Sequence, residues 1–134
     1  MTEYLNNTCA DPGYVCGRLL AVLAYVQAFA QNKNQHNYGA GAQIVERFFG
    51  SASVAPRSVF PVILRLNRHH LRKTAEENPG FTTNREKEME ELTCLLKGTN
   101  GSCPDFPTLL DLKGQGRFAL GFYHQRAEFR KASS

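Results

Sequence analysis

The sequence lacks the short motifs that mark the common catalytic and cofactor-binding sites. It has no phosphate-binding loop, no GxGxxG, no HExxH and no GxSxG, which are the signatures of nucleotide, metalloprotease and hydrolase chemistry. No stretch alternates apolar and polar residues over six or more positions, so β-strands are not expected. These absences favour a helical protein that is not an enzyme and that needs no cofactor.

The cysteine pattern and the N-terminus give no sign of export. None of the four cysteines forms a CxxC pair, and no basic segment followed by an apolar one opens the chain. Without a secretory signal the expected compartment is the reducing cytoplasm, where thiols stay free. The longest apolar-rich stretch, 19–30, is short for a bilayer and contains Gln27, so no membrane partner is expected. The cysteines are Cys9, Cys16, Cys94 and Cys103.

The bulk composition is that of one ordinary globular domain. The chain has 134 residues, 42% of them hydrophobic and 21% charged, which fits one domain over 1–134 with a real core. We expect residues 1–10 to be frayed. The formal net charge of +4 permits an anionic partner without requiring one.

Periodicity and capping residues predict an all-α bundle of about five helices. Asp11 and Pro12 form a start signal, followed by a helix to position 31 that is apolar around most of its circumference. Gly50 should end a short second helix, and Asn84 should cap a charged fourth one. The expected helices cover roughly 12–31, 42–49, 56 or 58 to 74 with Pro61 in its first turn or at a kink, 84–97 and 109–131. Loops are expected near 32–38, 51–56, 76–84 and 98–107.

The helix predicted to follow Pro56 carries charge of one sign. Between positions 57 and 73 it has five lysine or arginine residues and no acidic residue. At 100° per residue, Arg65, Arg68 and Arg72 fall within about 60° of arc on one face. Their guanidinium groups would lie about one turn, roughly 5 Å, apart, which approaches the phosphate repeat of a nucleic-acid strand. The opposite face holds residues expected to pack: Phe60, Ile63, Leu64 and Leu71.

A charged helix face is usually only a solvated surface, but surface helices normally mix signs and so gain ion pairs four residues apart. The helix expected over 84–97 mixes them, and the helix after Pro56 does not. Arginine also suits bidentate contact with phosphate. We therefore predict Arg65, Arg68 and Arg72 as contacts to a nucleic-acid backbone. The predicted flanking residues are Arg57, Lys73 and an exposed His69.

Several other residues are interpreted as structural. Phe118, Phe122 and Phe129 recur at helical spacing and predict core, although stacking of bases on such rings is an alternative. Cys16 and Cys94 are expected as small core residues. His70 is expected to be half-buried. No metal site is predicted, because adjacent histidines on a helix point about 100° apart.

Three blocks of the sequence resemble the C-terminal region of the large subunit of the type I-C CRISPR interference complex. The first is 17–23, GRLLAVL. The second begins with FGSAS at 49–53 and continues through Pro56 and Val-Phe-Pro at 59–61 to His-His-Leu at 69–71. The third is 116–126, GRFALGFYHQR. They occur in the same order as in that family and span most of the chain.

The chain is too short for the large subunit, so the resemblance implies the separate helical small subunit of this antiviral surveillance (Cascade) complex, in two copies. It implies partners as well: the large and backbone subunits, and target DNA near the guide-RNA heteroduplex, especially the displaced non-target strand of the R-loop. Arg18, Arg117 and Arg126 fall in the matching blocks and become further candidate DNA contacts. Their alternatives are pairing with acidic residues in the fold or binding to neighbouring subunits. The rival function is a purely structural module whose basic face docks on an acidic protein surface.

Overall fold

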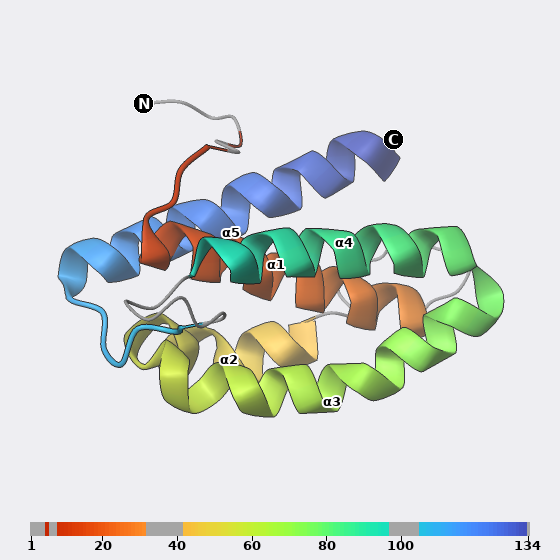
Figure 1. Ribbon diagram of the computed structural model, residues 1–134, viewed down its shortest axis with the longest axis horizontal. Coiled ribbons are helices and arrows are strands. Elements are labelled where there is room, and N and C mark those ends of the chain that lie inside the picture. The colour runs from red at the N-terminus through yellow and green to blue at the C-terminus, as the bar shows by residue number, and fades with distance from the viewer. Residues whose placement is uncertain (1–4, 6–7, 32–41, 97–104, 134) are drawn as a thin grey trace.

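The computed structural model describes residues 5, 8–31, 42–96 and 105–133. Within these ranges the chain forms five helices and no strand, which confirms the predicted all-α single-domain bundle (Figure 1). The expected loop at 32–38 lies outside the described residues, as do most of 1–10 and of 98–107. The helices are α1 (Pro12–Gln31), α2 (Ala42–Val54), α3 (Pro56–Glu77), α4 (Pro79–Leu95) and α5 (Leu112–Ser133).

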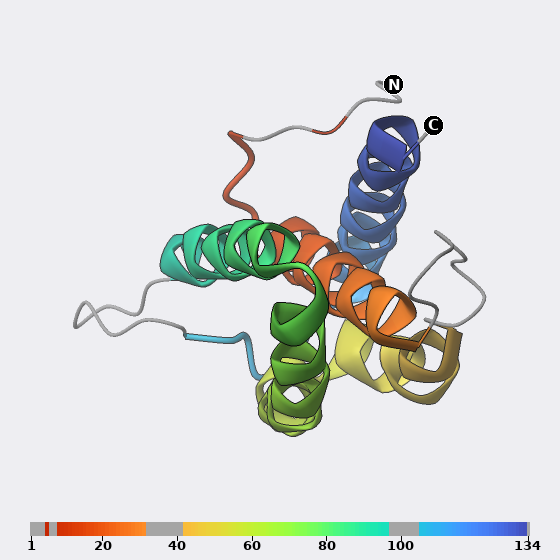
Figure 2. The same cartoon turned by 90° about the vertical axis from the view of Figure 1, so that its right-hand side faces the viewer.

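Helix α1 forms the centre of the bundle. It contacts each of the other four helices, which surround it in the view along the bundle (Figure 2). Its valine and leucine side chains have no measurable exposure: Val15, Leu19, Leu20, Val22, Leu23 and Val26. By length and composition alone α1 could cross a membrane, so our expectation of too short an apolar stretch is wrong. Its burial inside the bundle is what a core helix shows.

Helices α1 and α5 cross in direct backbone contact. A Cβ atom added at Gly17 would lie 1.9 Å from the carbonyl oxygen of Phe118, and one at Gly121 would lie 2.1 Å from that of Tyr14. Only glycine permits such an approach, because it has no Cβ atom. The predicted core rings Phe118 and Phe122 are both fully buried at this crossing, as expected.

Aspartates cap the first and last helices. The Asp11 carboxylate accepts hydrogen bonds from the backbone N–H groups of Gly13 and Tyr14 at 3.0 and 3.2 Å, as the Asp-Pro signal predicts. The Asp111 carboxylate accepts one from the N–H of Gly114 at 2.7 Å. Helix α5 therefore starts three residues later than predicted, because the capping aspartate precedes Leu112.

The second helix is longer than predicted. Gly50 does not end it, and the stretch expected as a loop over 51–56 continues the helix to Val54. The N–H of Ala55 still donates to the carbonyl of Ser51 at 2.8 Å, as in a helix. The break comes at Ala55 because the next residue is Pro56, which disfavours helical geometry in the residue before it.

A single residue joins α3 to α4, so the loop predicted near 76–84 is wrong. Asn78, rather than Asn84, caps α4, and its side-chain oxygen accepts from the N–H of Phe81 at 3.1 Å. The hydroxyl groups of Thr74 and Thr82 form a buried hydrogen bond of 2.7 Å across this corner. The Asn-Pro-Gly sequence therefore starts a helix here instead of forming an extended loop.

Candidate nucleic-acid interface

Helix α3 is oriented by its packing. Phe60, Ile63, Asn67 and Thr74 are buried and lie on one side of the helix. The helical repeat then turns the opposite side to solvent, where the predicted arginines lie. The exposed basic residues on this side form what we call the basic stripe: Arg65, Arg68, Arg72 and Lys73.

The basic stripe carries uncompensated charge. Among the described residues, none of its four side chains forms an ion pair or a hydrogen bond with another side chain. Glu76 lines a shallow hollow with Arg72 and Lys73 but makes no contact with them short enough for an ion pair. Within the described bundle no ion pair offsets the mutual repulsion of these four cations.

Arg57 differs from the basic stripe. Its guanidinium pairs with Asp105 at 2.8 Å and its Nε donates to the carbonyl of Phe106 at 2.9 Å. The Phe106 ring stacks in turn on Phe60, with 5.0 Å between ring centroids. Arg57 thus attaches the segment before α5 to the start of α3, and it is not the free flanking cation that the sequence predicts.

Arg18 is a core residue, which corrects its prediction as a DNA contact. It is only 9% exposed, and its Nε donates to the Gln125 side chain at 2.9 Å. Burial lowers the pKa of Arg18, while the nearby charges of Tyr14 and Glu88 partly oppose that shift. In this fold its guanidinium joins α1 to α5 and does not reach a surface ligand.

The two remaining candidate arginines lie on α5. Arg117 pairs with the capping Asp11 at 2.9 Å and is about half exposed. The Arg126 guanidinium lies over the Phe122 and Tyr123 rings, 5.4 and 5.3 Å from their centroids. Arg117 therefore joins α5 to the start of α1, which is the alternative that the sequence left open. Arg126 instead lies over rings of its own helix.

The two histidines beside the basic stripe lie as predicted. His69 is exposed and His70 is half-buried, with their rings edge to face at 5.7 Å. Burial lowers the pKa of His70, and the charges of His69 and Lys73 lower it further. His70 is therefore a neutral ring at neutral pH. Within the described ranges no three potential metal-ligating side chains come together.

Two hollows flank the basic stripe. One, of about 490 Å³, lies against the segment before α5 and is lined by Arg57, Pro61, Leu64, Arg65, Arg68, Asp105 and Phe106. The other, which we call the α2–α3 groove, has about 370 Å³ and is lined by Gln27, Ile44, Arg47, Phe48, Leu66, His69 and His70. Sequence reasoning missed the α2–α3 groove because three helices build it. The apolar Leu66 on the polar side of α3, 46% exposed, was the one local sign of it.

The cysteines divide between core and surface. Cys16 is fully buried, and burial raises the pKa of its thiol to about 12, with a smaller contribution from Asp11. Cys94 is exposed, so its prediction as a core residue is wrong. Cys9, Cys16 and Cys94 are free thiols, and Cys103 lies outside the described residues.

The fold and this surface define an all-α single-domain bundle with an uncompensated basic face. The profile of the family described as CRISPR-associated protein (Cas_Csd1) matches residues 1–130. The chain therefore belongs to this CRISPR-associated Csd1 family, and the match confirms the resemblance carried by the three sequence blocks. No curated protein matches the chain.

Proposed function

We propose that this protein is a non-catalytic small subunit of a type I-C CRISPR surveillance complex and that its basic stripe contacts the backbone of target DNA. The observation that carries the proposal is the exposure of Arg65, Arg68, Arg72 and Lys73 along one side of α3 without a partner among the described residues. A phosphate backbone supplies the counter-charge that the bundle does not.

The spacing of these groups supports a linear polyanion as the partner. Arg65, Arg68 and Arg72 follow one another at intervals of three and four residues, about one helical turn each, or roughly 5 Å. Guanidinium groups bind phosphate oxygens in pairs and keep their charge at any physiological pH. The displaced non-target strand is the partner we favour, because its bases are unpaired and protein contacts are needed to hold it apart from the target strand.

Such contacts have a defined task in RNA-guided recognition. Base pairing with the guide reads the sequence, and exchange of one duplex for another is nearly balanced in free energy. Protein contacts to the displaced backbone therefore decide how long the opened state persists. In this proposal the subunit works in the cytoplasm beside the large and backbone subunits and a second copy of itself, and another protein cleaves the DNA.

The second candidate function is protein docking, and one observation favours it. Val62 and Leu66 are 40% and 46% exposed on the same side of α3 as the basic stripe. Mixed apolar and basic faces are common in protein interfaces. In that case the guanidinium groups would pair with acidic residues of a neighbouring subunit.

A salt titration separates these two functions. We expect single-stranded DNA binding to weaken with salt, with a slope of about 0.7 per phosphate contacted. Replacing Arg65, Arg68 and Arg72 by alanine should lower that slope by about 2. When the salt concentration rises from 50 to 200 mM, the DNA affinity of the variant should therefore fall by a factor roughly 20 times smaller than that of the unaltered protein. Assembly with the other subunits, measured by co-purification, should persist.

The matched control removes the same charge elsewhere. Lys87, Lys113 and Arg130 are exposed and lie on α4 and α5. Replacing these three by alanine should leave the slope nearly unchanged. An equal fall in both variants would mean that only net charge matters, and loss of assembly with normal DNA binding would favour protein docking. Either result overturns the proposed DNA contact.

A further inference from the structure

The α2–α3 groove opens on the edge of the basic stripe. His69 lies on α3 between Arg65 and Leu66 in angle around the helix, and it lines the groove together with Leu66 and His70. The opposite wall comes from α2 and the inner end from Gln27 of α1. A strand whose phosphates follow the basic stripe therefore passes the mouth of this groove.

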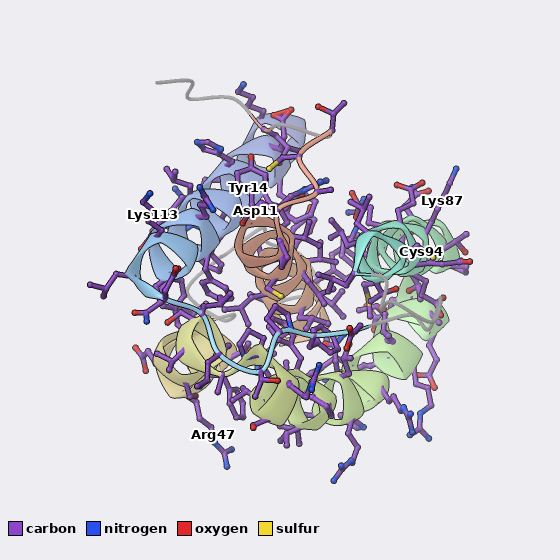
Figure 3. The ribbon with its side chains drawn as sticks, turned by 60° about the vertical axis from the view of Figure 1, so that its left-hand side comes forward. Asp11, Tyr14, Arg47, Lys87, Cys94 and Lys113 are labelled. Atoms are coloured by element: carbon purple, nitrogen blue, oxygen red, sulfur yellow. The ribbon has the colours of Figure 1, made fainter. Side chains whose placement is uncertain are left out.

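Planar side chains dominate the lining of the groove. Phe48 and the two histidines supply rings, and the Arg47 guanidinium lies over the Phe48 ring at 5.2 Å. Figure 3 shows Arg47 extending outward from α2. Unpaired bases stack on aromatic rings and on guanidinium planes in single-strand recognition. His70 is neutral, so it adds a flat ring without further charge.

The inner end of the groove offers a hydrogen-bond donor. Gln27 is 95% buried, and its side-chain oxygen accepts from the backbone N–H of Ile44 at 3.2 Å. That bond fixes the orientation of the Gln27 amide, with its oxygen toward Ile44. In the part of the chain that the structure describes, the amide nitrogen has no acceptor, so it is available to a carbonyl or ring nitrogen at the edge of a base.

We infer that the α2–α3 groove binds a nucleobase of the single DNA strand whose backbone the basic stripe holds. The inference rests on the proposed function, since without a strand on the stripe no base is delivered to the groove. It adds an anchor that does not depend on charge: a base turned out of the strand stacks in the groove beside Phe48. The volume of about 370 Å³ falls in the range of small-molecule sites.

The test compares two strands of equal charge. One is an oligothymidine, and the other is a chain of abasic deoxyribose phosphates of the same length. The protein should bind the oligothymidine at least about fivefold more tightly, which is the effect of one stacked base. Replacing Phe48 by leucine keeps apolar bulk and removes the ring, and it should abolish most of that preference while leaving the abasic affinity unchanged.

Two controls accompany this variant. Tyr123→Leu removes an exposed ring of α5 outside the groove and should keep the preference for bases. His69→Ala removes an exposed ring of the groove without disturbing the core, so it tests the groove even if Phe48→Leu does not fold. Replacing the three arginines of the basic stripe should weaken both strands by the same factor.

The outcomes distinguish the two proposals. Equal binding of the two strands, or a preference that survives both groove variants, overturns the base-binding groove and leaves the backbone contact intact. Failure of the protein to bind either strand at low salt overturns the proposed function and the groove with it. A base preference lost in the groove variants alone supports both.

Discussion

Replacing Gly17 by alanine tests the helix crossing at the centre of the bundle. The new Cβ atom would lie 1.9 Å from the Phe118 carbonyl oxygen and 2.8 Å from the Phe122 backbone nitrogen. An ordinary contact needs at least 3.4 Å, so the atom is about 1.5 Å too close to backbone on the facing helix. Because the obstacle is backbone, no side-chain rotation relieves it, and α1 and α5 must separate.

The magnitude follows from two opposing effects. Alanine favours a helix over glycine by about 1 kcal/mol, and overpacking in a close-packed core costs about 3 kcal/mol or more when the obstacle cannot move. We expect a net destabilisation of about 2 kcal/mol or more, against a total stability of about 5–15 kcal/mol. With a urea dependence of about 2 kcal/mol/M, the unfolding midpoint should fall by about 1 M.

The control uses glycines that have open space around them. A Cβ atom at Gly50 or Gly116 would meet nothing within 4 Å. Alanine there should raise the free energy of unfolding by about 0.5–1 kcal/mol through helix propensity alone. Equal or greater stability of Gly17→Ala than of the unaltered protein in urea denaturation would refute the crossing described here. Gly121→Ala, which faces the Tyr14 carbonyl at 2.1 Å, should behave as Gly17→Ala does.

Two further predictions concern buried groups. In the folded protein at pH 8 a thiol-alkylating reagent should modify the exposed Cys94 but not Cys16. Cys16 is buried, and its pKa of about 12 keeps the thiol protonated. Cys16 should react only after urea unfolds the chain. Peptide mass spectrometry follows both sites, and equal modification without urea would contradict the burial of Cys16. Asn67 is fully buried with no partner for either side-chain polar atom among the described residues, so Asn67→Leu should raise stability by about 1–2 kcal/mol. A large loss of stability in urea denaturation would instead reveal a hydrogen bond to that amide.

The proposed DNA contact and the proposed base-binding groove would hold a strand by different interactions, the first by charge and the second by stacking. Contacts of the basic stripe with phosphates would weaken with salt and would not depend on sequence. Stacking in the α2–α3 groove would depend on the presence of a base and little on salt. A subunit with both features would hold a displaced strand at the moderate salt of the cell without reading its sequence, which is delegated to the guide.

Local interactions could be predicted from the sequence because both partners are close along the chain. The Asp11-Pro12 start of α1 is an example, since the carboxylate bonds to N–H groups two and three residues away. The face shared by Arg65, Arg68 and Arg72 is another, because the helical repeat alone determines it. The order of the three sequence blocks also sufficed to indicate the family.

The packing of segments that are distant in the sequence determined which arginines are paired and where the groove lies. Arg57 meets Asp105 across 48 positions and Arg18 meets Gln125 across 107, so no spacing rule reveals that these arginines are occupied. The α2–α3 groove exists only because residues from three helices converge. Sequence periodicity places charge on one side of a helix, but whether a carboxylate from elsewhere neutralises it depends on how the helices pack. That packing occupies Arg57 and leaves the four residues of the basic stripe without such a partner in the described part of the chain.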